Sequence, residues 1–86
     1  MITVQPLEKP SKNRLLVCWR EPPLCNYTEQ LWALRTAAIS TVCALSGKPI
    51  RQGDRVYRPV GEPLNGTQHL LADAVQELLP SDCAID

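Results

Sequence analysis

The sequence predicts an α+β fold: a small, strongly bent antiparallel sheet, or an SH3-like partial barrel, with one C-terminal helix. Two observations predict the sheet. Short stretches that alternate between apolar and polar residues are separated by glycine turns, and eight prolines are spread over a chain of 86 residues. The third observation is one clear helical stripe of apolar residues near the C-terminus. The barrel is an analogy at the level of the fold.

The first two elements are predicted to be strands joined by the polar turn "KPSKN". In "RLLVCWR", Leu15, Val17 and Trp19 share one face of a strand. Leu16 and Cys18 share the other face. Because both faces are apolar in the middle, we predict an interior strand rather than an edge strand. Two consecutive prolines, which cannot donate a ladder hydrogen bond, end it.

Residues 28–39 are open between strand and helix. Leu31 and Leu34 are spaced as on a helix, and the segment is rich in good helix formers. A strand would place Gln30, Trp32 and Leu34 on one face, and neither face would be cleanly apolar. Taken alone, the segment narrowly favours a helix. The following "STVCAL" favours a strand.

Residues 42–59 are predicted to form a hairpin without metal, with turns set by Ser46, Gly47, Gly53 and Asp54. The stretch "CALSG" begins like a zinc knuckle, but Ser46 stands where the second cysteine belongs. A serine hydroxyl can bind the amide two residues on and stabilise a tight turn. At Gly53 we expect a positive φ, which a side chain resists.

The loop "GEPLNG" follows, and Gly61 within it is expected to carry no such conformational demand. A helix is predicted from Thr67 to Leu79, capped by Asn65 or Thr67 and stopped by Pro80. It is expected to pack on the sheet through one stripe of apolar side chains: Leu71, Ala74, Val75 and Leu78.

The chain is predicted to be a single domain over residues 1–86, ordered over 1–80 with a tail over 81–86. Nine basic and nine acidic residues balance, which argues against a general binder of the phosphate backbone. "MITVQPLEKP" shows no signal peptide, and no apolar run approaches the roughly 20 residues that a membrane helix needs. We expect a cytoplasmic protein with no membrane association.

The cysteines are expected to be free thiols, and no metal or other cofactor is predicted. Structural zinc prefers cysteine pairs two to four residues apart, and no such pair exists here. The competing hypothesis is a zinc-binding module with a degenerate knuckle. It would need Cys43 to meet several of the remaining candidate ligands in space: Cys18, Cys25, Cys83 and His69.

Four segments occur in order: "LLVCWREP", "YTEQLWALR", "VCALSGKPIRQGDRVYRP" and "HLLADAV". Together they resemble a family of small β-proteobacterial proteins classed as a domain of unknown function. The family pattern runs C-W-R-D/E-P, then Y-x-E-Q-x-W, then V-C-A-L-S/T-G-x-x-I-x-x-G-D-x-V-F/Y-R-P. The resemblance covers about residues 13–76. It implies a bacterial origin and one small domain, with no established activity, and it implies that Ser46 is an ordinary turn residue.

No catalytic constellation is visible, so we do not expect an enzyme: His69 is the only histidine, and nothing near Cys18 would activate its thiol. We expect a non-enzymatic module that binds an unknown protein partner. The alternative is a nucleic-acid-associated small barrel. The candidate patch for a ligand or partner is a cluster in sequence: Arg51, Arg55, Tyr57 and Arg58. The aromatic residues Trp19, Trp32 and Tyr57 could form a core or a binding cage, and the oligomeric state is open.

Overall fold

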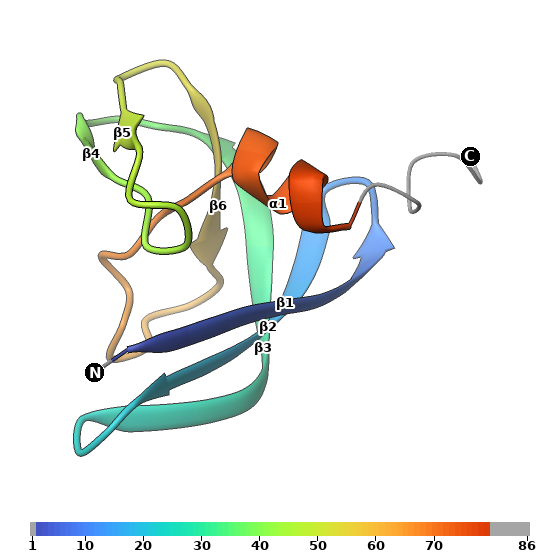
Figure 1. Cartoon of the computed structure of the whole chain (residues 1–86), viewed down its shortest axis with the longest axis vertical. Helices are drawn as coiled ribbons and strands as arrows, with labels where there is room; N and C mark the ends of the chain where they lie inside the picture. The colour runs from blue at the N-terminus through green and yellow to red at the C-terminus, as the bar shows by residue number, and fades with distance from the viewer. Residues whose placement is uncertain (1, 80–86) are drawn as a thin grey trace.

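The computed structural model describes residues 2–79. Five antiparallel strands, in the order β1-β2-β3-β6-β7, curl into a half-barrel, and a separate two-stranded ladder joins β4 to β5 (Figure 1). A short helix follows β7. The α+β prediction is confirmed. The elements are β1 (Thr3–Ser11), β2 (Arg14–Glu21), β3 (Cys25–Thr36), β4 (Thr41–Val42), β5 (Pro49–Ile50), β6 (Arg55–Pro59), β7 (Leu70–Leu71) and α1 (Ala72–Leu78).

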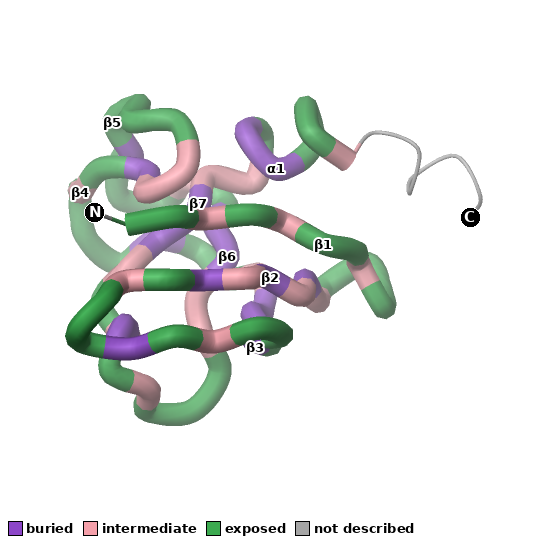
Figure 2. Tube along the Cα trace, turned by 60° about the horizontal axis from the view of Figure 1, so that its bottom comes forward, coloured by how far each residue is buried: buried purple, intermediate pink, exposed green. Residues whose placement is uncertain are grey.

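Strand β2 lies between β1 and β3, as its two apolar faces predict. Leu15, Val17 and Trp19 are fully buried on its inner face. Strand β1 is the long edge strand, and its tube in Figure 2 is mostly exposed. Its pairing with β2 is irregular on either side of Glu8, and it carries two prolines. Both features hinder further strands from adding to that edge.

The narrow preference for a helix in residues 28–39 is wrong, because β3 extends to Thr36. It pairs with β2 along one edge and with β6 along the other. Hydrogen bonds to two neighbouring strands override the helix propensity of its residues. The alternation of apolar and polar residues that indicates a strand is interrupted here, because Gln30 is a polar residue on the inner face and Leu31 is an apolar residue on the outer face. Gln30 is 8% exposed and Leu31 is 39% exposed.

The predicted hairpin over residues 42–59 is wrong in its pairing. Thr41–Val42 pairs with Pro49–Ile50, whereas β6 pairs with β3 and β7. This arrangement buries both faces of β6, because Val56 and Tyr57 enter two different apolar clusters. A hairpin of β6 with the 41–50 segment would leave β3 without its second partner.

Two glycines occupy the turns as expected, with φ of +77° at Gly47 and +98° at Gly53. The contrast drawn with Gly61 is wrong, since its φ is +82°. A side chain at any of these three positions would be strained.

The helix is shorter than predicted and begins at Ala72. Residues 67–69 are loop, and Leu70–Leu71 forms β7, which pairs with β6. Leu70 is thereby fully buried, and this burial outweighs the helical pattern of its neighbours. On α1, Ala74 and Val75 are buried as predicted. The predicted packing of Leu78 on the sheet is wrong, because its side chain is 56% exposed. The predicted stop at Pro80 and the tail over 81–86 lie outside the described residues.

The core consists of two adjoining apolar clusters. The larger one forms inside the half-barrel, where the rings of Trp19 and Trp32 lie 5.7 Å apart with an interplanar angle of 34°. Tyr57 belongs to this cluster and is 2% exposed. Of the two alternatives left open for the three aromatic residues, core or binding cage, the structure shows the core. The smaller cluster joins the β4–β5 segment to β6 and α1 through Ala37, Cys43, Ile50, Val56 and Ala74.

Leu70→Ala should lower the free energy of unfolding by about 2–4 kcal/mol, because the side chain is buried and its removal leaves a cavity. Leu78→Ala is the matched control, and its cost should stay below about 0.5 kcal/mol. Urea denaturation of both variants measures the difference. Equal losses would contradict the assignment of Leu70 to β7 and the core.

Candidate functional site

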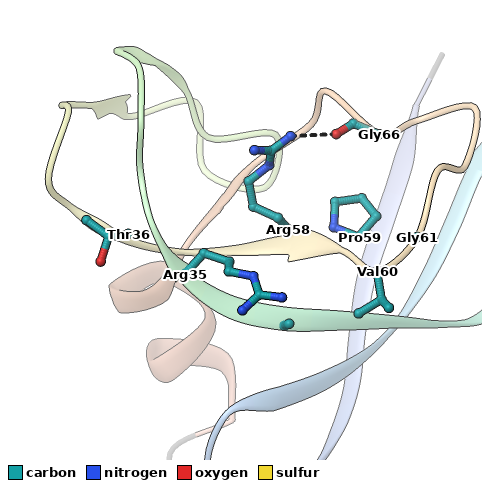
Figure 3. Close-up of a pocket in the computed structure, with 8 residues that line it drawn as sticks. Arg35, Thr36, Arg58, Pro59, Val60, Gly61 and Gly66 are labelled. Carbon is teal, nitrogen blue, oxygen red and sulfur yellow. Dashed lines mark hydrogen bonds between the residues drawn. The ribbon is translucent and has the colours of Figure 1, made fainter.

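A pocket of about 340 Å³ opens on the outer face of the sheet, where β3 and β6 pair (Figure 3). Ala33 of β3 lies directly opposite Arg58 of β6. Among the described residues that line the pocket, two are arginines and none is acidic. The lining residues are Ala33, Arg35, Thr36, Arg58, Pro59, Val60, Gly61 and Gly66.

Arg58 is anchored in the wall of this pocket. One terminal nitrogen of its guanidinium donates a 2.8 Å hydrogen bond to the carbonyl oxygen of Gly66 (Figure 3). Its Nε is buried and has no hydrogen-bond partner among the described residues. The positive charge of Arg58 is therefore fixed in position, and its Nε–H donor is not used within the described chain.

The side chain of Arg35, unlike that of Arg58, is not held by a hydrogen bond to a described residue. Its side chain is exposed and makes no hydrogen bond or ion pair with any residue of the described chain. Figure 3 shows its guanidinium extending along β3 toward Val60. An unengaged guanidinium can bind a carboxylate through two parallel hydrogen bonds.

The loop over the pocket is held from inside the core by an amide pair. Gln30 Nε2 donates to Asn65 Oδ1, and Asn65 Nδ2 donates to Gln30 Oε1, each at 2.9 Å. The indole Nε1 of Trp32 donates to the same Gln30 Oε1 at 3.0 Å. Both amides are buried, so each stabilises the other in place of water.

Sequence reasoning missed this amide pair. Asn65 was expected to cap a helix, but it pairs with Gln30 in the core, 35 residues away in the chain. The one signal for it in the sequence was the position of Gln30 two residues before Trp32. In a strand, residues with this spacing lie on the same face, so Gln30 would share the inner face with the tryptophan.

His69 follows the same loop and is 2% exposed. Its Nδ1 lies 3.0 Å from the carbonyl oxygen of Thr67, so Nδ1 carries the proton of the neutral ring. Nε2 is buried and has no partner in the described chain. Burial lowers the pKa of His69 and the charge of Arg58 lowers it further, while the Thr67 carbonyl acts in the opposite direction.

The residues of the predicted patch lie in different places. Tyr57 is in the core, and Arg51 is exposed in the turn that Asp54 closes by accepting a 2.9 Å hydrogen bond from the Arg51 amide. Arg55 and Arg58 are three residues apart on one strand and so face opposite sides of the sheet. Of the four, only Arg58 lines the pocket, and its companion there is Arg35.

Ser46 makes the turn contact that the sequence suggests: its Oγ accepts a 3.3 Å hydrogen bond from the Lys48 amide. Cys43 is buried, and its sulfur accepts hydrogen bonds from the amides of Ser46 at 3.4 Å and Leu71 at 3.2 Å. Burial raises the pKa of Cys43, but the hydrogen bonds to its sulfur outweigh burial and leave the pKa lowered.

The three cysteines that the structure describes, Cys18, Cys25 and Cys43, are free thiols. Within residues 2–79, no three histidine, cysteine or acidic side chains gather as a metal site would require. Cys83, the fourth candidate ligand, lies outside the described residues.

A family model described as Domain of unknown function (DUF3331) matches residues 1–77. The chain belongs to this family. The predicted resemblance to a domain of unknown function is thereby confirmed, and the DUF3331 match covers the whole half-barrel and most of α1. No curated protein and no solved structure matches the chain significantly. No helix of residues 2–79 is long and apolar enough to cross a membrane.

Asn65→Ala should destabilise this DUF3331 domain by about 1–3 kcal/mol, because it leaves the buried Nε2 donor of Gln30 without its acceptor. Asn26→Ala, at an exposed position of β3, is the matched control and should cost less than about 0.5 kcal/mol. Denaturant unfolding measures both values. A similar small loss for both variants would show that the amide pair does not hold the loop.

Acidification should destabilise the domain through His69. Because the folded pKa lies below the unfolded value of about 6.5, the unfolded chain takes up more protons than the folded chain as the pH falls through that value. The free energy of unfolding should therefore fall between pH 7.5 and 5.5, by at most about 1.4 kcal/mol per pH unit. Urea unfolding at several pH values measures the slope. His69→Gln should flatten it, because the chain has a single histidine.

Proposed function

We propose that this chain is a cytoplasmic, non-enzymatic module that binds a protein partner on the outer face of its sheet. The observation that carries the proposal is an exposed apolar pair, Leu31 and Val60, beside the arginine-lined pocket. These side chains are 39% and 47% exposed, and the Val60 amide donates a 3.0 Å hydrogen bond to the Leu31 carbonyl. The buried core of a protein interface is more apolar than the rest of the surface, and arginine is enriched in interfaces.

The absence of catalysis is part of this proposal. Nucleophilic chemistry would need a thiol with an accessible base beside it. Cys43 and His69 are 1% and 2% exposed, so a substrate could not reach either group in this fold. The free thiols of the described cysteines suit a compartment in which thiols stay reduced, which supports the cytoplasmic location.

A nucleic-acid-binding barrel is the weaker alternative. That function would use Tyr57 as a stacking platform together with the arginines of the hairpin. The ring of Tyr57 is 2% exposed, and Lys9 Nζ lies 5.7 Å from its centre. The charge balance of the whole chain also offers no surplus for phosphate neutralisation. A protein partner therefore fits the outer face better.

Photo-crosslinking in cells of the source organism tests the proposal. A photoreactive amino acid at position 60 should yield one defined adduct, whose partner is identified by mass spectrometry. The same amino acid at position 42, where Val42 is 57% exposed on β4, is the matched control. The adduct from position 60 should weaken strongly when Leu31→Asp is added, because the apolar pair is lost. Equal adducts from both positions, or none from position 60, would overturn the proposal.

A further inference from the structure

We propose that the pocket between β3 and β6 is a carboxylate-binding site that receives an acidic side chain of the partner. Arg35 would bind the carboxylate, and Arg58 would supply a fixed positive charge in the pocket wall. The inference rests on the proposed function and specifies the chemistry of the partner.

The first argument is the fixed charge of Arg58. Its guanidinium is tied to the Gly66 carbonyl, and the loop that carries Gly66 is itself held by the core amide pair of Asn65 and Gln30. Its buried Nε donor has no partner in the described chain. A positive charge that is partly removed from water and not paired inside the protein attracts an anion more strongly than a solvated one.

The second argument is the free guanidinium of Arg35. It lines the same pocket and extends toward Val60, so an anion that it binds also lies beside the exposed apolar pair (Figure 3). Its planar fork matches the two oxygens of a carboxylate. An acidic residue flanked by an apolar residue would satisfy both features at once, with the carboxylate on Arg35 and the apolar side chain on Leu31 and Val60.

A carboxylate fits this pocket better than a phosphate. Phosphate sites gather several backbone amides or a cluster of cations around three oxygens. Here one guanidinium is free, and the other already donates to Gly66. A single bidentate pair with a nearby positive charge is the arrangement suited to one carboxylate.

The glycines of the chain provide a built-in test by amide NMR. Gly61 and Gly66 line the pocket, whereas Gly47 and Gly53 lie in turns outside the pocket lining. The ¹⁵N-labelled protein is titrated with N-acetyl-Leu-Glu-Leu-amide and with its Gln counterpart at constant ionic strength. The Glu peptide should shift Gly61 and Gly66 saturably while Gly47 and Gly53 stay in place. The Gln peptide should bind about tenfold more weakly.

Three variants with the same loss of charge separate this pocket from the patch suggested by the sequence. Arg35→Gln should weaken the Glu peptide about tenfold. Arg55→Gln and Arg51→Gln, which do not line the pocket, should leave its affinity unchanged. Arg35 is chosen because its side chain is exposed and makes no hydrogen bond or ion pair with a described residue, so its replacement should leave the fold intact. Equal effects of the three variants, or equal binding of the two peptides, would overturn the carboxylate site.

Inorganic phosphate is titrated in parallel. If phosphate shifts Gly61 and Gly66 at lower concentration than the Glu peptide, the pocket is a phosphoryl site and the inference is wrong. Failure of the proposed function is distinguishable from failure of this inference. A position-60 adduct that survives Arg35→Gln would keep the interaction module and remove the carboxylate site. Peptide binding without any adduct from position 60 would keep the carboxylate site and remove the interaction module.

Discussion

The indole N–H of Trp32 needs a hydrogen-bond acceptor inside the core, and much of the structure depends on how that need is met. The chain has no phenylalanine, so two tryptophans fill the half-barrel and bring two indole N–H groups with them. Trp19 lies where its N–H can reach Glu21 near the end of β2, at 3.0 Å. The N–H of Trp32 forms a buried hydrogen bond to Gln30, a polar residue that the core must then accommodate.

Burying Gln30 has consequences along the rest of the chain. Its amide needs further partners, and Asn65 supplies both a donor and an acceptor. Asn65 in turn places the loop of residues 61–69 against β6, where Gly66 receives the guanidinium of Arg58. The pocket wall on the outside of the sheet is therefore held by a hydrogen bond that begins inside it. A buried polar network of this kind fixes one arrangement because every alternative leaves a group unsatisfied.

The sequence predicted the parts of the fold that depend on local pattern. β2 was predicted by its two apolar faces, and the turns at Gly47 and Gly53 by glycine. The two errors between helix and strand have one cause. β3 and Leu70 carry helix-forming residues but are strands, because pairing with partners distant in the chain buries Trp32 and Leu70 completely. Local propensity cannot report a hydrogen bond made between such distant residues.

The candidate site could not be predicted for the same reason. Arg51, Arg55 and Arg58 are close in sequence, but a strand reverses the direction of its side chains at every residue, so Arg55 and Arg58 face opposite sides. Arg35 lies far from Arg58 in sequence, yet the antiparallel register sets Ala33 opposite Arg58, and Arg35 shares the face of Ala33. Only the register of β3 with β6 brings the two guanidinium groups to one pocket. Sequence proximity therefore grouped arginines that the fold separates, and the pairing of two strands groups Arg58 with Arg35 instead.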